Sequence, residues 1–195
     1  MSTVYNLPNY RDKYFEYKDL DKIHGQPTID TIAKLLRQVK RNAQRVPTVL
    51  GGGQFGYLAL VIEVASYNTI HGSAPFIRPH DPGIFTPDHP IGVRAIPLTA
   101  ADIAAQKITF DEQKRQYNEC QGVEMALRNQ IVEAIEEEYL QPLRDSITDM
   151  ITSTIPTIFT FLQQTYGNLS PSELKERERV LDDMIYDPSQ NVGST

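Results

Sequence analysis

Apolar residues recur at helical spacing through most of this chain, and no segment shows the sustained alternation of a half-buried strand. The clearest helical stretch follows Thr28, where Thr28 or Asp30 can accept the free amide hydrogens of the first turn. This pattern predicts an all-α fold, a bundle of several helices packed through their apolar stripes. The stripe of the first helix consists of Ile29, Ile32, Ala33, Leu35, Leu36 and Val39.

Proline and glycine separate this helix from the sequence that follows. Pro47 ends it, Gly51–Gly53 gives a loop that can adopt positive φ, and a short buried helix is expected over 55–65. Residues 73–98 hold six of the 13 prolines, so we expect a long extended surface loop there, in which 91–96 could form a short hairpin. Whether this loop is functional or mobile is left open.

The long helix that follows the proline-rich loop has a recognisable start. Thr99 and Asp102 have the spacing of a capping box. Gly122 is expected to divide this helix into two pieces, because glycine costs about 1 kcal/mol in a helix interior. The helical period then continues over 139–151.

Two helices are predicted near the C-terminal end of the sequence. The first begins at Pro156 and buries Ile158, Phe159, Leu162 and Tyr166, and Gly167 is expected to end it in the left-handed conformation. The second has a serine cap, a proline at its first position and a glutamate that completes a capping box. The residues that start and stop this last helix are Ser170, Pro171, Glu173 and Pro188.

These elements divide the chain into an N-terminal arm, 1–22, a helical domain, 23–188, and a short tail, 189–195. The proline-rich loop, 73–98, lies within the helical domain. The arm is polar and tyrosine-rich without a clear period, so we expect it to order only against a partner or against the domain body.

The net charge of the chain limits the kinds of molecule that it is expected to bind. The net charge is −6, from 19 basic and 25 acidic residues, which is not typical of a general nucleic-acid binder. A local basic stripe could still contact RNA or phosphate, because its four members lie within about 80° of one another on the first helix. The simpler interpretation is a solvated helix surface. The stripe consists of Lys34, Arg37, Arg41 and Arg45.

Cysteine usage and hydropathy indicate where such a protein resides. The single cysteine, Cys120, excludes an internal disulfide and fits a reducing compartment, and its place on an apolar helix face indicates a small core residue. The longest apolar run, Tyr57–Ile62, is too short to span a bilayer, and the first residues lack the features of a signal peptide. We therefore expect a cytoplasmic protein with no membrane partner.

Motifs for catalysis or cofactor binding are weak. Gly51-x-Gly53-x-x-Gly56 matches a dinucleotide-binding fingerprint in form, but that chemistry needs a strand before it, and Pro47 makes 46–50 a poor strand. A glycine turn between two helices explains the pattern better. We therefore predict no catalytic residue and no cofactor.

The histidines and acids of the proline-rich loop are the nearest approach to a metal site. His80-Asp81 and Asp88-His89 could supply ligands, but neither pair lies on a rigid element that would preorganise them. We predict no metal site there. The carboxylates at 133–138 form a charge run at a helix end, which is typical of hydrated surface.

Several short motifs follow one another in a particular order over most of the chain. They lie at Asp21–Thr28, Val46–Gly53, Gly56–Val61, Ala74–Pro79, Gln130–Ile135, Thr165–Gly167 and Met184–Pro188. Each motif alone is weak, but in this joint order they resemble Gag-like capsid proteins of copia-type LTR retrotransposons.

This resemblance implies a non-enzymatic capsid protein that associates with itself into virus-like particles and packages RNA in the cytoplasm. Many Gag proteins carry a zinc knuckle, which one cysteine cannot form, so the chain is expected to correspond to an N-terminal capsid domain. Two alternatives remain open. One is a helical module that binds RNA or protein without particle assembly, and the other is an enzyme whose pocket involves the glycine turn and the proline-rich loop.

Overall fold

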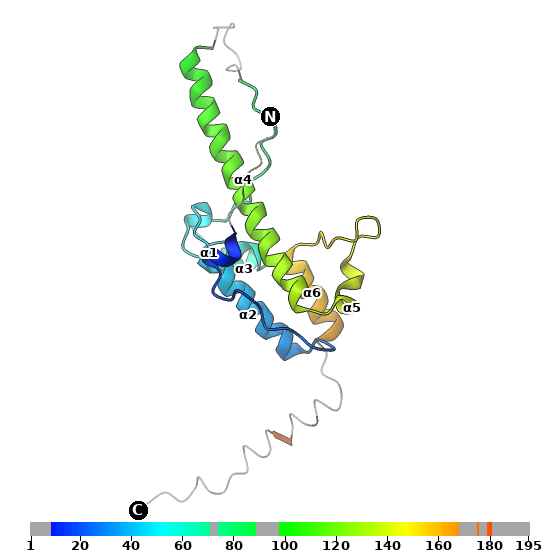
Figure 1. Cartoon of the computed structure of the whole chain (residues 1–195). Helices are drawn as coiled ribbons and strands as arrows, with labels where there is room; N and C mark the ends of the chain where they lie inside the picture. The colour runs from blue at the N-terminus through cyan, green and yellow to red at the C-terminus, as the bar shows by residue number, and fades with distance from the viewer. Residues whose placement is uncertain (1–8, 71–73, 89–97, 168–174, 176–178, 181–195) are drawn as a thin grey trace, which may run out of the picture.

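A computed structural model of the chain describes residues 9–70, 74–88, 98–167, 175, 179 and 180. The described residues are mainly helical, as predicted, and their only β-pairings are two isolated bridges. The longest helix, α4 (Ala100–Ala134), extends beyond the other helices at its N-terminal end (Figure 1), and α2 (Ile29–Arg45) packs against both α4 and α6 (Ile155–Tyr166).

Helix α2 begins where its cap predicts. The Thr28 hydroxyl accepts the amide hydrogen of Thr31, and the Thr31 hydroxyl accepts that of Thr28, which completes a reciprocal capping box. The helix buries one face against α4 and α6. The fully buried apolar residues of that face are Ile32, Leu35, Val39 and Ala43.

Helix α4 begins with the predicted capping box of Thr99 and Asp102. The predicted break at Gly122 is wrong, because the helix runs through this buried glycine without interruption. Fully burying Val123 or Leu127 contributes about 1.5–3 kcal/mol each, which exceeds the cost of about 1 kcal/mol for one glycine. Packing therefore decides the continuity of this helix.

Helix α6 is capped by Thr154, whose hydroxyl accepts the amide hydrogen of Thr157, and it carries Pro156 in its first turn. It buries Ile158, Phe159 and Leu162, as predicted, and also Ile155, whereas Tyr166, which was also predicted to be buried, is only partly buried. The prediction of a left-handed stop at Gly167 is wrong, since its φ is −78°. A Cβ at Gly167 would lie 2.3 Å from the carbonyl oxygen of Gln163, so close approach and not positive φ explains the glycine.

The described part of the predicted N-terminal arm is built into the core. A short helix, α1 (Tyr10–Tyr14), contacts α4, and Tyr10, Phe15 and Leu20 are buried. The amide of Ile23 donates to the carbonyl oxygen of Ala134 at 2.7 Å. The described part of this segment therefore packs against the domain body, one of the two ways in which the arm was expected to order.

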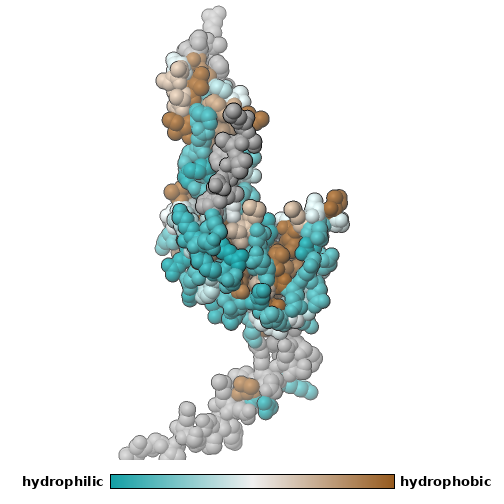
Figure 2. All heavy atoms as spheres, viewed as in Figure 1, coloured by the Kyte–Doolittle hydropathy of each residue, from teal (hydrophilic) through white to brown (hydrophobic). Residues whose placement is uncertain are grey.

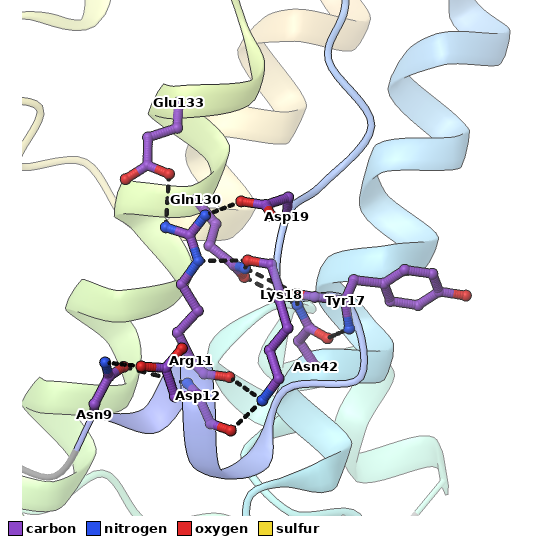
Figure 3. A network of polar contacts seen from close by, with 9 residues as sticks. All are labelled: Asn9, Arg11, Asp12, Tyr17, Lys18, Asp19, Asn42, Gln130 and Glu133. Carbon is purple, nitrogen blue, oxygen red and sulfur yellow. Dashed lines mark hydrogen bonds and ion pairs between the residues drawn. The ribbon is translucent and has the colours of Figure 1, made fainter.

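Two buried amide side chains hold this segment in place (Figure 3). Asn42, on α2, exchanges two hydrogen bonds with the backbone of Tyr17, at 2.8 and 2.9 Å, and donates to Gln130 of α4 at 2.9 Å. Gln130 in turn donates to the carbonyl oxygens of Tyr17 and Lys18 at 2.9 and 2.8 Å. Buried amides satisfied in this way fix both helices and the segment in one register.

The helix predicted over 55–65 is wrong. That stretch holds a 3-10 turn, η2 (Leu58–Leu60), and the first residues of helix α3 (Val64–Ile70), and another 3-10 turn, η1 (Leu50–Gly52), lies before it. Gly56 has φ +53°, which an α-helix does not permit, so the chain turns there before it reaches the apolar run.

The predicted continuation of the helical period over 139–151 is also wrong. The structure forms one short helix, α5 (Glu137–Leu140), a 3-10 turn, η3 (Gln141–Leu143), and then a loop closed by a bridge between Arg144 and Ile151. Asp145 explains the change, because its carboxylate accepts the amide hydrogens of Ile147 and Thr148 and so competes with a helix.

Two predictions fall outside the described residues. These are the hairpin at 91–96 and most of the helix at 170–188, of which only residues 175, 179 and 180 are described, all in helical conformation. The described part of the proline-rich loop, 74–88, is extended. No helix among the described residues is both long and apolar enough to cross a membrane.

Candidate interaction surfaces

The basic stripe predicted on α2 lies at the surface, and the N-terminal segment supplies acids that neutralise part of it. Lys34 pairs with Asp21 at 2.7 Å. Glu16 pairs with Arg41 at 3.0 Å and with Arg45 at 3.3 Å. Hydrogen bonding from Arg41 lowers the pKa of Glu16, and that from Lys34 lowers the pKa of Asp21.

Arg37 is the exception within the stripe. It is exposed, and among the described residues it has no acidic partner. The stripe therefore carries less net positive charge than its sequence indicates. Sequence reasoning missed the neutralising acids because they lie in the segment interpreted as an arm.

The glycine motif forms a turn, as predicted, between α2 and η2. Gly51, Gly53 and Gly56 all have positive φ, at 57°, 74° and 53°. A Cβ at Gly56 would lie 2.6 Å from the carbonyl oxygen of Gln44, and one at Gly51 would lie 2.5 Å from the hydroxyl oxygen of Tyr67. Close packing and backbone conformation therefore account for these three glycines.

The proline-rich segment lies along the N-terminal half of α4 and is held to it by side chains. Asp81 pairs with Lys114 at 2.6 Å, and the rings of Phe85 and Phe110 meet edge to face with centroids 5.4 Å apart. The amide of Asp88 donates to the Gln106 side chain at 2.9 Å. We call residues 74–88 the strap.

The predicted histidine and acid pairs do not form a cluster in the described structure. His80 lines a hollow of about 370 Å³ beside Arg78 and Gln113, whereas the Asp81 carboxylate is engaged by Lys114. His89 lies outside the described residues. Within the described ranges there is no group of three or more histidine, cysteine or acidic side chains placed to hold a metal ion.

Sequence reasoning missed one buried charge, Glu124. Its side chain is 4% exposed and pairs with Arg78 of the strap and with Arg128, the latter at 3.3 Å. Glu124 shares a helix face with Cys120 and Leu127, at spacings of four and three, and that position was the available signal. A buried carboxylate is costly unless it is paired, so Glu124 holds Arg78 and the strap against the inner part of α4.

The strongly shifted pKa values belong to core residues and surface ion pairs. Burial raises the pKa of the Cys120 thiol to about 11 and that of the Tyr10 hydroxyl to about 12. Hydrogen bonds from Arg115, with a second contribution from Gln116, lower the pKa of Glu112 to about 2. Cys120 is fully buried, as its predicted role in the core requires.

Large apolar side chains are exposed at two places that project from the packed body. On the strap and the outer half of α4, Ile84 is 91% exposed and Ile108 is 71% exposed. In the loop after η3, Ile147 is 92% exposed and Met150 is 66% exposed. Figure 2 shows apolar atoms at both places, near the far end of α4 and at the tip of the loop beside α6.

The loop that carries Ile147, residues 144–151, is held by its own hydrogen bonds, and we call it the Ile147 loop. The Asp145 carboxylate accepts the amide hydrogens of Ile147 and Thr148 at 3.1 and 2.8 Å. The Asp145 amide donates to the carbonyl oxygen of Met150 at 3.0 Å. Arg144 donates to the carbonyl oxygen of Asp149 at 2.7 Å. The exposed isoleucine therefore stands on a fixed support.

A groove with an apolar floor lies where α2, η2, α3 and α6 meet, and we call it the α6 groove. Its volume is about 290 Å³. Ile70, at the end of α3, is 53% exposed at its edge, and Lys40 and Glu63 supply charge at the rim. The apolar and ring residues that line it are Leu36, Val61, Ile62, Ile70, Pro156 and Phe159.

Comparison with known proteins found no matching family model, no matching curated protein and no matching solved structure.

Proposed function

We propose that this chain is a non-enzymatic assembly domain of the Gag-like capsid type, which associates with copies of itself and packages RNA into particles in the cytoplasm. The observation that supports this proposal best is the exposure of large apolar side chains on fixed, projecting elements. Ile108 lies on the outer half of a continuous helix, and Ile147 lies on a loop closed by hydrogen bonds.

Such residues are costly to leave in water unless another surface covers them. Fully burying an isoleucine contributes about 1.5–3 kcal/mol, and exposed apolar residues that lie together in a patch mark interaction sites. In a shell or lattice the same small contact is repeated many times, so weak pairwise affinities accumulate through multivalency. Modest surface patches such as these suit that mode of assembly.

The described polar groups support a structural role in the same way. The amides of Asn42 and Gln130, the carboxylate of Glu124 and the carboxylate of Asp81 each join segments that are distant in the sequence. Each is engaged by a partner within the fold. These polar side chains hold the elements of the fold together. The exposed apolar residues, such as Ile108 and Ile147, are available for contact with other molecules.

The second candidate function is a helical module that binds RNA without assembling particles. The exposed Arg37, with Lys34, Arg41 and Arg45 around it, supports phosphate contact on α2. The acids Glu16 and Asp21 weaken that contact by occupying three of the four basic side chains. Particle assembly with modest RNA affinity is therefore the leading proposal.

Negative-stain electron microscopy of the purified chain, with and without single-stranded RNA, tests the proposal. We expect discrete oligomers or curved assemblies that become more abundant when RNA is added. Uniform monomers under both conditions, together with salt-sensitive RNA binding, would favour the module without particle assembly. Uniform monomers without RNA binding would contradict both functions.

A further inference from the structure

We propose that copies of this chain join head to tail, with the Ile147 loop of one copy seated in the α6 groove of the next. This inference rests on the proposed function, since it names the contact through which self-association takes place. The occupant of the groove is a second copy of this chain. The contact is heterologous, because the two surfaces that meet are different parts of the molecule.

The Ile147 loop has the properties of an inserting element. Its tip presents Ile147 and Met150, which are 92% and 66% exposed, so neither is covered within its own molecule. The Asp145 carboxylate and the bridge between Arg144 and Ile151 fix the loop before any partner arrives. Little conformational entropy remains to be lost when such a loop docks.

The α6 groove has the matching properties of a receiving site. Its floor includes Val61 and Phe159, which are almost fully buried, and Ile70 stands half-exposed at its edge. A groove of about 290 Å³ with an apolar floor can accept branched aliphatic side chains of the kind that the loop presents. Both surfaces remain exposed within one copy, so each is available to another.

Charge favours this pairing and its orientation. The loop carries two acids, Asp145 and Asp149, and one arginine, Arg144, which pairs with Asp149 at 3.3 Å, so the loop has a net charge of −1. The groove rim carries Lys40 and Glu63, and Arg37 lies about 60° farther around α2 than Lys40, so these three residues have a net charge of +1. Within the described part of the chain, neither of these cations has an acidic partner.

The arrangement has a consequence for assembly. A contact between two different surfaces does not close on itself in a pair, so repeated copies form rings or open chains. A symmetric contact of one surface with itself would stop at two copies. Rings are the kind of unit from which closed shells are built, which connects this contact to the proposed function.

The test uses two single variants of the whole chain and their mixture. Ile147→Asp damages only the loop, and Ile70→Asp damages only the groove. Both residues are exposed, so we expect the variants to fold, which circular dichroism checks. Sedimentation velocity should show each variant alone associating at least about tenfold more weakly than the wild-type chain, because each loses an apolar contact and gains a buried charge.

The mixture gives the decisive result. In a one-to-one mixture, the intact loop of the Ile70→Asp chain can enter the intact groove of the Ile147→Asp chain, and no further copy can add. We expect a heterodimer at concentrations where each variant alone is monomeric. If the contact were symmetric through either surface, mixing the two variants would not restore association. A one-to-one mixture that stays monomeric would therefore overturn the proposal.

Two controls separate this contact from general surface effects. Val49→Asp changes another exposed branched aliphatic side chain, which is 70% exposed and lies outside the groove lining, and it should leave the association unchanged. Lys40→Glu should weaken association, whereas Lys22→Glu, with the same charge change away from the groove lining, should not. Equal effects of the two lysine variants would contradict the charge pairing.

The outcomes also distinguish this inference from the proposed function. If the wild-type chain associates and neither Ile147→Asp nor Ile70→Asp weakens it, the head-to-tail contact is wrong and the assembly function stands. If only Ile70→Asp weakens it, the groove receives another occupant, such as the chain's own 168–195 segment, and the contact is again wrong. If the wild-type chain never associates, the proposed function itself fails.

Discussion

The side chains of Asn42 and Gln130 determine where the N-terminal segment lies, because their amides satisfy backbone groups of Tyr17 and Lys18 that would otherwise be buried without partners. Asn42 is fully buried, and Gln130 is 2% exposed. Removing such a group leaves several donors and acceptors unsatisfied at once, which costs more than the single hydrogen bond is worth.

Replacing Gln130 with alanine should therefore destabilise the fold by about 2–3 kcal/mol, measured as the loss of unfolding free energy in urea. Gln113→Ala is the matched control, since it changes the same residue type at an exposed position of the same helix. We expect that control to stay within about 0.5 kcal/mol of the wild-type chain. Equal losses for the two variants would show that the buried amide network does not hold the segment.

Cys120 gives a prediction for alkaline pH. Burial raises its pKa from 9.0 to about 11, so the folded state holds the thiol proton at pH values where the unfolded state releases it. The stabilisation is complete below pH 9 and is lost as pH rises from about 9 to about 11, by up to about 3 kcal/mol. Urea titrations at pH 8 and pH 10 should show this loss.

Cys120→Ala provides the control for that titration. The variant is less stable at every pH because alanine is smaller, but its unfolding free energy should fall less steeply between pH 8 and pH 10. Tyr10, whose pKa is raised to about 12, leaves a residual slope at the upper end of this range. An unchanged slope in the variant would contradict the assignment to the thiol.

At the scale of elements, the turn between α2 and η2 depends on a glycine that meets two requirements. Gly56 has φ +53°, and a Cβ there would lie within 2.7 Å of the carbonyl oxygens of Gln44, Ala43 and Val46. Gly83 has φ +71° with open space around it, so it meets only the first requirement. Comparing substitutions at Gly56 and Gly83 therefore separates the cost of a left-handed backbone conformation from the cost of steric overlap.

Gly56→Ala should destabilise the chain by about 3 kcal/mol or more, because it adds overpacking to the cost of a left-handed residue. Gly83→Ala should cost about 1 kcal/mol, from conformation alone. Thermal unfolding followed by circular dichroism measures both. A Gly56→Ala chain as stable as the Gly83→Ala chain would show that the turn relaxes away from its present geometry.

The sequence predicts elements well where the determining contacts are local. Thr28, Thr99 and Thr154 cap α2, α4 and α6 through residues three positions later, so these starts can be inferred without a structure. The errors at 55–65 and 139–151 have the opposite origin. Gly56 turns because the end of α2 lies against it, and Asp145 forms a loop that apolar periodicity cannot indicate.

At the scale of the whole molecule, the candidate surfaces are less predictable still. The basic stripe was visible as a helical spacing, but its neutralisation by Glu16 and Asp21 depends on the path of a distant segment. The Ile147 loop and the α6 groove are identified by which side chains are exposed in the folded chain, and the spacing of apolar residues in the sequence does not predict that exposure. Only the assembled fold shows which isoleucines remain uncovered.

The neutralisation of the stripe predicts how RNA binding should respond to mutation. Glu16→Gln frees Arg41 and Arg45, so it should strengthen binding to single-stranded RNA and steepen its decrease with salt. Arg37→Glu should weaken binding. Fluorescence anisotropy at several salt concentrations measures both, and Glu112→Gln, the same charge change on α4, is the control. Equal effects of the two glutamine variants would place the RNA contact elsewhere.

The central claim is that this chain associates with itself, and sedimentation velocity over a wide range of concentrations tests it most directly. We predict a weight-average mass that rises above the 22.1 kDa of one chain as concentration increases, because the exposed apolar side chains are then covered by other copies. A single 22.1 kDa species at every concentration would contradict the claim.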